Sequence, residues 1–511
     1  MSRERAINSL QLSRRCSRPP PRTTSPQAQP FFHLRRALYS TESSFQASST
    51  PPPTAEPADH RRLGTQQKLF TTSIYSPGSP LLLPHGKRIA NRLVDFLRKQ
   101  YVRYGFEEVD TPTIYKKALW EKSGHLENYA DDMFSVTSQS RRTSCCGNEA
   151  KDEEDEGDYG LKPMNCPGHC LIFASETRSY AELPIRYADF SPLHRNEVSG
   201  ALSGLTRLRR FHQDDGHIFC RPIQVEREIR RTLGFVRFAY QVLRIDSGGF
   251  RLALSTRPLE HYIGTVEEWD RAEAALRRAL DASGQSWSVN DGDGAFYGPK
   301  IDVIIKDSDG KEHQTATIQL DFQMPKRFGL KYEAPAPEYE ARGEETTDPR
   351  LLAKHGDVTP VLIHRAVLGS VERLMALLIE RYNGRWPFWL NPRQAIIMSV
   401  NDAPETTMWA QEVHNLLEGH DGDENLESGV VPRDVQQPTG LAVDLDLRAI
   451  TLGRKKVQAD SKGYGLIIAI GASEAKSRTV SVSGPSFGNG RKNMSPEELL
   501  DMMQKMANTF Q

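Results

Sequence analysis

The sequence predicts an α+β protein in which helices flank an antiparallel sheet, followed by a smaller C-terminal α/β domain. Between residues 161 and 390, short apolar segments alternate with turn signals such as those at 291–294 and 307–310. Strands separated by Asp- and Gly-rich turns are typical of antiparallel sheets. Helical segments among these strands indicate an α+β arrangement.

A change of pattern predicts the second domain. Asn391 and Pro392 end the first block. After them, apolar strands at 395–400 and 466–470 alternate with helical segments. Alternating strands and helices are typical of small α/β domains, which we expect over residues 392–511.

The overall composition narrows the class of protein. A chain of 511 residues suggests roughly three folding units. Lys plus Arg and Asp plus Glu both number 66, so net charge gives no support for a nucleic-acid partner and any RNA surface must be local. No apolar run is long enough to predict a membrane span. Six scattered cysteines argue against a disulfide scaffold and favour a reducing compartment.

The N-terminal residues differ from the rest. Residues 1–40 contain eight Arg, one Glu, no Asp and no Lys, with many Ser and Thr, which predicts a mitochondrial transit peptide. The alternative is a disordered basic tail that contacts RNA. The Ser-, Pro- and Thr-rich residues 41–59 have the composition of a disordered linker.

Residues 138–160 interrupt the predicted domain. Five acidic residues follow one another at 152–156, and such a run stays solvated because like charges repel. We expect a disordered surface insertion here. The alternative is a metal or redox pair at Cys145 and Cys146.

Two segments place polar residues among apolar strands. We expect a strand at 360–363 and a helix at 366–380, with Gly369 and Ser370 in its first turn. Arg373 would then reach an anion at the helix N-terminus, where backbone donors favour negative charge. Alternatively, Arg373 pairs with an acidic neighbour on a solvated face.

The other segment runs through a strand end and a basic loop. Arg195 and Glu197 alternate along the strand, Arg207 lies in the loop and Phe211 follows it. Arginine binds phosphate in a bidentate manner, and a carboxylate accepts hydrogen bonds from an amine, so this pattern suits a nucleotide. A basic RNA-facing loop or a surface hairpin is the alternative.

Together these features resemble the threonyl-tRNA synthetase family, within class II of the aminoacyl-tRNA synthetases. The similarity extends over about residues 60–511, and the order of the motifs makes it specific. The motifs that carry it are Met164-Asn-Cys-Pro-Gly-His169, His194-Arg-Asn-Glu197, Gln213-Asp-Asp215, Phe296-Tyr-Gly-Pro-Lys300, Gln319-Leu-Asp-Phe322 and His364-Arg-Ala366.

The resemblance implies a class II catalytic domain at 60–391, an anticodon-binding domain at 392–511 and a zinc site at Cys166, His217 and His364. One thiolate and two imidazoles leave zinc an open position for substrate. The zinc would take the amino and hydroxyl groups of threonine. Valine, which lacks the hydroxyl, would be rejected, whereas serine would be the expected error. From the residues alone, a local set with Cys170 and His169 would rank first.

The resemblance also implies roles for the remaining residues. For ATP, it implies Arg195, Glu197, Arg207, Phe211, Gln314, Gln319 and Arg373, with Arg195, Lys300 and Arg373 acting in catalysis. For threonine, it implies Gln213, Asp215 and Tyr297. His85 is a further candidate near the tRNA ribose.

The implied reaction uses ATP with Mg²⁺ to form threonyl-adenylate, and then charges tRNA(Thr) in the mitochondrial matrix. The segment 41–59 is too short for the editing domain that many relatives carry, so we expect none and measurable serine mischarging. The helix expected at 89–104 resembles the class II dimerisation motif, so we expect a homodimer. A prolyl or seryl ligase and a non-catalytic RNA-binding relative are the competing hypotheses.

Overall fold

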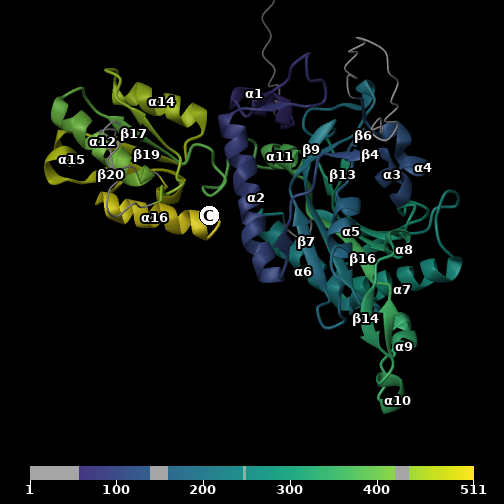
Figure 1. Cartoon of the computed structure of the whole chain (residues 1–511). Coiled ribbons are helices and arrows are strands. Elements are labelled where there is room, and N and C mark those ends of the chain that lie inside the picture. The colour runs from purple at the N-terminus through teal and green to yellow at the C-terminus, as the bar shows by residue number, and fades with distance from the viewer. Residues whose placement is uncertain (1–56, 138–158, 246–248, 420–436, 489) are drawn as a thin grey trace, which may run out of the picture. The chain divides into compact units, whose positions relative to one another are not determined.

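The computed structural model describes residues 57–137, 159–245, 249–419, 437–488 and 490–511 (Figure 1). The predicted transit peptide and most of the predicted linker and insertion lie outside these ranges. Among the described residues, no helix combines the length and apolar character that crossing a bilayer requires.

A nine-stranded sheet is the centre of the first block, and it confirms the predicted antiparallel arrangement. Its strands follow the order β11-β10-β12-β13-β16-β9-β7-β3, with β8 paired to β9. Only the outer pairs β10–β11 and β3–β7 are parallel. The strands are β3 (Glu107–Glu108), β7 (Ile185–Asp189), β8 (Pro192–His194), β9 (Arg210–Cys220), β10 (Phe250–Ser255), β11 (Trp287–Asn290), β12 (Lys300–Lys306), β13 (Glu312–Asp321) and β16 (Val361–Ser370).

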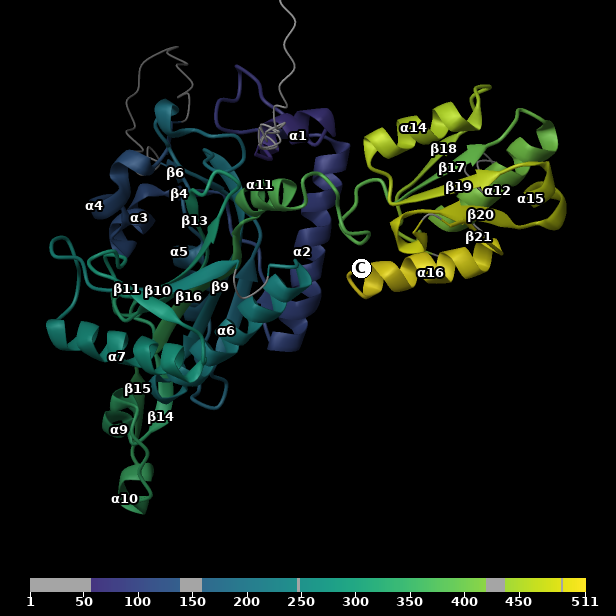
Figure 2. The ribbon, with the colours of Figure 1, turned by 180° about the vertical axis from the view of Figure 1, so that it is seen from behind.

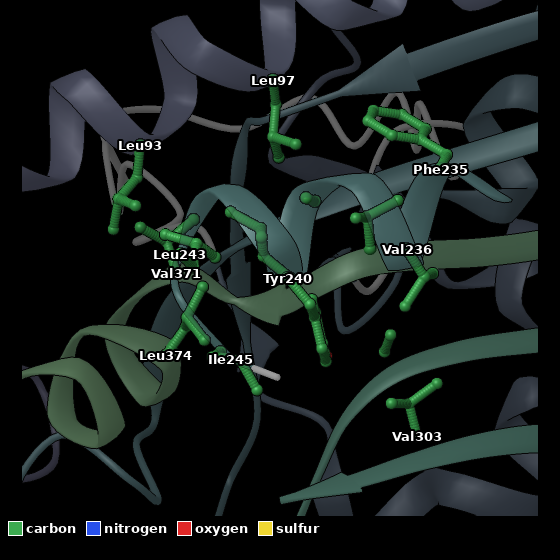
Figure 3. Close-up of a cluster of buried hydrophobic side chains, with 14 of the residues drawn as sticks. Leu93, Leu97, Phe235, Val236, Tyr240, Leu243, Ile245, Val303, Val371 and Leu374 are labelled. Carbon is green, nitrogen blue, oxygen red and sulfur yellow. The ribbon is translucent and has the colours of Figure 1, made fainter. Parts of the chain in front are cut away.

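Three of the amphipathic helices that supply the core packed against the sheet are α2 (Pro84–Tyr104), α6 (Val225–Val242) and α11 (Val371–Arg381). Figure 3 shows Leu93 and Leu97 of α2, Tyr240 of α6 and Leu374 of α11 gathered near Val303 of β12. The apolar stripe predicted from residue 89 onward is therefore buried, as helical spacing requires.

Further helices and short strands surround the sheet. The remaining helices of this block are α1 (His60–Gln66), α3 (Lys117–Ser123), α4 (His125–Tyr129), α5 (Cys166–Ala174), α7 (Val266–Ala282), α8 (Met324–Phe328), α9 (Pro337–Arg342) and α10 (Pro349–Leu352). The remaining strands are β1 (Phe70–Thr71), β2 (Leu81–Leu82), β4 (Ile114–Lys116), β5 (Ser135–Val136), β6 (Tyr159–Leu161), β14 (Tyr332–Pro335) and β15 (His355–Val358). The predicted linker 41–59 ends slightly too late, because Asp59 already caps α1. The predicted insertion 138–160 also ends slightly too late, because Tyr159 already pairs in β6.

The helix predicted at 366–380 begins too early. β16 continues to Ser370, and α11 starts at Val371 with the Ser370 hydroxyl accepting from the Arg373 backbone N–H. The strand lengthens through an irregularity between Ala366 and Ser370, where Gly369 adopts a φ of 69°. A left-handed glycine within a bulge keeps the chain paired to β9, which helical spacing could not indicate.

The C-terminal block confirms the predicted α/β pattern. Its five-stranded sheet has the order β18-β17-β19-β20-β21, with β17 parallel to both β18 and β19 (Figure 2). The elements are β17 (Ala395–Ser399), α12 (Pro404–Glu418), β18 (Val443–Asp446), α14 (Leu452–Lys462), β19 (Leu466–Ile470), α15 (Ala472–Ser477), β20 (Val480–Ser483), β21 (Lys492–Met494) and α16 (Pro496–Asn508).

Arg365 of β16 is buried and contacts aromatic side chains on the core face of the sheet. Arg365 is 1% exposed, and its guanidinium lies 4.4 Å from the ring centre of Tyr101 and 4.0 Å from that of Phe106. It also donates to the Tyr101 hydroxyl at 2.9 Å. Gly216 is its partner on β9, and a Cβ there would meet the Arg365 guanidinium carbon at 2.7 Å. The absence of a side chain at Gly216 therefore leaves room for the arginine.

We predict that Gly216→Ala lowers the free energy of unfolding by about 1–3 kcal/mol, because the enclosed Arg365 cannot move aside. The matched control is Gly234→Ala on the exposed side of α6, where a Cβ meets nothing within 4 Å. It should raise stability by up to about 1 kcal/mol through helix propensity. Urea unfolding of both variants checks this, and equal midpoints for Gly216→Ala and the unmodified chain would contradict it.

Candidate active site

One row of side chains crosses four neighbouring strands of the large sheet. His217 on β9 pairs with His364 on β16, His364 pairs with Gln319 on β13, and Gln319 pairs with Lys300 on β12. Residues opposite one another in neighbouring strands project from the same face of a sheet. The strand register therefore places these four side chains side by side, although they are far apart in the sequence.

A second row lies two residues along the same strands. It pairs Asp215 with Ala366, Ala366 with Thr317, and Thr317 with Asp302. Because side chains alternate along a strand, Asp215 shares the face of His217. The small Ala366 leaves space above the centre of this row.

The two rows line a cavity of about 420 Å³. Every candidate metal-, ATP- and threonine-binding residue from the sequence contributes to its lining: Cys166, Arg195, Glu197, Arg207, Phe211, Gln213, Asp215, His217, Tyr297, Lys300, Gln314, Gln319, His364 and Arg373. His85 does not line it. The structure thus brings these candidates together in one cavity.

Cys166, His217 and His364 form a compact donor set at one end of the cavity. Their ligand atoms all lie within 4.8 Å of one another, and the residues are 1–6% exposed. Burial raises the pKa of the Cys166 thiol and lowers the pKa of His217. A neutral imidazole can donate its lone pair to a metal, and a bound cation would stabilise the thiolate. The donor types fit zinc with a position left toward the cavity.

The local alternative, Cys166 and Cys170 with His169, is not brought together as a group of close metal donors within the described residues. Cys170 is 0% exposed and packs in an apolar cluster with Phe173 and Phe219. His169 contacts the His217 ring and does not line the cavity. Cys170 lies one helical turn beyond Cys166 in α5 and, unlike Cys166, does not line the cavity.

Neighbouring side chains fix the ring of His364. Its Nε2 lies 2.9 Å from the buried carboxylate of Asp321. The Tyr297 ring stacks on it with centroids 4.9 Å apart, and the Tyr297 hydroxyl donates to Gln319. Asp321 was not predicted as a site residue, although it lies within the Gln319–Phe322 motif.

Three arginines gather at the other end of the cavity. Burial, together with the positive charges of Arg195 and Arg207, lowers the pKa of Arg373. Arg373 donates from Nε to the Thr206 carbonyl at 2.9 Å and from Nη1 to the Gln314 carbonyl at 2.8 Å. The predicted alternative, in which Arg373 pairs with an acidic neighbour on a solvated face, is therefore wrong. Converging positive charges create a binding place for an anion such as phosphate.

The basic loop is arranged by charge pairs and ring contacts. The Arg195 guanidinium lies 5.1 Å from the ring centre of Phe211. Glu197 accepts from Arg207 at 2.7 Å. A ligand amine at Glu197 would therefore compete with Arg207 for this carboxylate.

Lys300 is held between two carboxylates. Its Nζ lies 3.1 Å from Asp302 and 3.2 Å from Asp293. Burial lowers the pKa of Lys300, but these two carboxylates outweigh it and raise the pKa above its ordinary value. Lys300 therefore carries a positive charge in the cavity. Asp293 and Asp302 were not predicted, although Asp302 lies two residues along β12 from Lys300 and so shares its face; Asp293 comes from the loop between β11 and β12.

Comparisons with known proteins agree with this geometry. Residues 148–341 match the family described as tRNA synthetase class II core domain (G, H, P, S and T), and residues 394–506 match the anticodon binding domain family. A solved structure described as the RNA binding domain of threonyl-tRNA synthetase from Cryptosporidium parvum is 40% identical, with a TM-score of 0.72, covering 88% of this chain and 98% of that one.

Two curated yeast proteins are similar over most of their length. One, from Schizosaccharomyces pombe, is named "Probable threonine--tRNA ligase, mitochondrial" and is 49% identical, covering 88% of this chain and 89% of that protein. The mitochondrial threonine–tRNA ligase of Saccharomyces cerevisiae is 46% identical, covering 86% and 89%. Because these relatives are 46–49% identical over most of both chains, the chain belongs to the threonyl-tRNA synthetase family of the class II aminoacyl-tRNA synthetases.

Proposed function

We propose that this chain joins threonine to tRNA(Thr) in two steps. The threonine carboxylate attacks the α-phosphate of ATP, which forms threonyl-adenylate and releases pyrophosphate. The terminal ribose hydroxyl of the tRNA then attacks the acyl carbon and releases AMP. The observation that carries the proposal is a single cavity with three guanidinium groups near one end and a thiol–bis-imidazole set at the other.

The arginines and Lys300 would act on the phosphates. Arg195 holds the α-phosphate and the threonine carboxylate, Arg207 contacts the terminal phosphates, and Arg373 and Phe211 bracket the adenine. Lys300, charged by its two carboxylate neighbours, faces the reacting phosphate. Mg²⁺ accompanies the ATP. Phosphoryl and adenylyl transfers depend chiefly on positioning and charge stabilisation, which these residues supply without a general base.

Cys166, His217 and His364 would hold a zinc ion. When bound, zinc supplies a Lewis-acidic position that takes the amino and hydroxyl groups of the amino acid. Asp215 lies in the next row of the sheet and would accept a hydrogen bond from the hydroxyl, while Gln213 and Tyr297 line the same end. Valine would leave Asp215 buried without its donor, and such an unpaired group costs more than a lost contact.

The remaining assignments rest on the family. Residues 60–391 form the catalytic domain, and residues 392–511 bind the anticodon loop. The Arg-rich residues 1–40 and the two mitochondrial yeast relatives support a place in translation within the mitochondrial matrix. The resemblance of α2 to the class II dimerisation motif supports a homodimer.

The direct test is ATP–pyrophosphate exchange by the purified chain with threonine, serine, valine and proline. We expect exchange with threonine, weaker exchange with serine and none with valine or proline. Stripping zinc with a chelator should abolish the threonine signal, and adding zinc back should restore it. Exchange with proline alone, or unchanged threonine exchange without zinc, would contradict the proposed substrate or the proposed metal.

Replacement of Arg195 tests the proposed role of the arginines at the phosphates. Arg195→Ala should lower kcat/KM for threonine-dependent exchange by about 10²–10³-fold, because a preorganised charge on the reacting phosphate is lost. Arg210→Ala is the matched control: it is exposed, lies on the same loop-strand segment and does not line the cavity. Its rate should stay close to that of the unmodified chain, and equal losses in both variants would argue against the specific role of Arg195.

A further inference from the structure

A line of buried polar groups continues behind the donor set, away from the cavity. His217 Nδ1 lies 2.8 Å from Nδ1 of His169, which belongs to α5. On the far side of that ring, His169 Nε2 lies 3.6 Å from the Asp189 carboxylate at the end of β7. His169 is 0% exposed and Asp189 is 1% exposed. His169 does not line the cavity, so it has no contact with a substrate there.

A metal bound at the donor set would decide which nitrogen of His217 carries the proton. Nε2 of His217 faces Nδ1 of His364 at 3.0 Å, inside the donor set, so this nitrogen would offer its lone pair to the metal. A neutral imidazole carries one proton, which then lies on Nδ1. His217 Nδ1–H can therefore only donate to His169, and His169 Nδ1 must accept.

The position of the His169 proton follows from that of the His217 proton. If His169 accepts at Nδ1, its proton lies on Nε2, the nitrogen that faces Asp189. No hydrogen-bond partner within the described residues satisfies this buried nitrogen. At 3.6 Å the Asp189 carboxylate is too distant for a good hydrogen bond, but its negative charge favours a proton on the facing nitrogen.

Asp189 is itself held in place. Its Oδ2 accepts from the Thr111 hydroxyl at 2.7 Å, and its Oδ1 accepts from the Ser191 backbone N–H at 2.7 Å. The Lys162 ammonium, 0% exposed, lies 3.8 Å away and compensates the charge. Thr111, Ser191 and Lys162 therefore fix the carboxylate behind His169.

The two imidazoles of the donor set are thus supported differently. His364 faces the carboxylate of Asp321 directly at 2.9 Å, whereas His217 faces His169 with a carboxylate behind it. Residues that accept the second N–H of a metal-binding histidine set its tautomer and orientation, and they affect metal affinity about 10–100-fold.

We propose that His169 is a positioning residue for the zinc site: it accepts the Nδ1 proton of His217, with Asp189 behind it, so that His217 Nε2 is presented to the metal. This inference rests on the proposed zinc-dependent function. It assigns to His169 a role in metal retention rather than in contact with threonine or ATP.

The test compares His169→Asn with His169→Leu. Both side chains branch at Cγ, but only asparagine places an acceptor oxygen near the position of the lost Nδ1. Cys170→Ala, the next residue of α5, is the control for disturbance of the helix. Zinc content, the rate of zinc release to a chromophoric chelator and the visible spectrum of the Co²⁺-substituted protein are measured for each. Urea unfolding of the metal-free proteins reports whether each variant folds.

We expect His169→Leu to hold zinc about 10–100-fold more weakly than the unmodified chain and to change the Co²⁺ spectrum. His169→Asn and Cys170→Ala should stay close to the unmodified chain in both measurements. Should leucine prevent folding, His169→Gln provides a polar replacement whose amide reaches the Nε2 position instead, and it too should hold zinc less tightly than His169→Asn.

The outcomes separate this inference from the function on which it rests. If the unmodified chain holds zinc and His169→Leu, or the glutamine variant used in its place, holds it as tightly as His169→Asn, the role of His169 is overturned and the proposed function stands. Equal loss in His169→Asn and Cys170→Ala would also overturn it, since any change in α5 would then suffice. If the unmodified chain holds no zinc, both the inference and the zinc-dependent function fail.

Discussion

The antiparallel pairing of β9 with β16 is the constraint on which the rest of the site depends. It sets His217 opposite His364, and a slip of one strand by one residue would turn the ring on that strand toward the core. The opposite face of the same pairing carries Asp214, which accepts from the Val367 and Leu368 backbone N–H groups at 2.7 and 2.9 Å. The two faces of this strand pair therefore depend on the same register. Contacts on the core face hold the register that aligns the side chains on the cavity face.

The cavity combines two different solutions to burying polar groups. At one end, the positive charges of Arg195 and Arg207 act on Arg373, and this repulsion makes the end receptive to an anion. At the other end, buried imidazoles and a thiol lose solvation, and a cation would compensate for that loss. Both ends are thus organised for ligands of opposite charge, which matches a site that takes ATP beside a metal-bound amino acid.

Much of this architecture follows from local patterns in the sequence. Short apolar segments and turn residues predict the antiparallel sheet, and alternating elements after Asn391 predict the α/β domain. Where a bulge overrides local spacing, as at Gly369, the predicted helix start is wrong. The ligand set came from family resemblance, because residues 166, 217 and 364 lie on three separate elements. The contacts of Asp321 with His364 and of His169 with His217 emerge only from tertiary packing, which no spacing rule encodes.

The central claim is that threonine is recognised beside a zinc ion held by Cys166, His217 and His364. Zinc K-edge X-ray absorption of the purified chain, recorded alone, with threonine and with valine, tests it most directly. We predict one sulfur at about 2.3 Å and two nitrogens at about 2.0–2.1 Å from the zinc. Threonine should change this coordination, and valine should leave it unchanged. A second sulfur ligand, or a spectrum that threonine leaves unaltered, would contradict it.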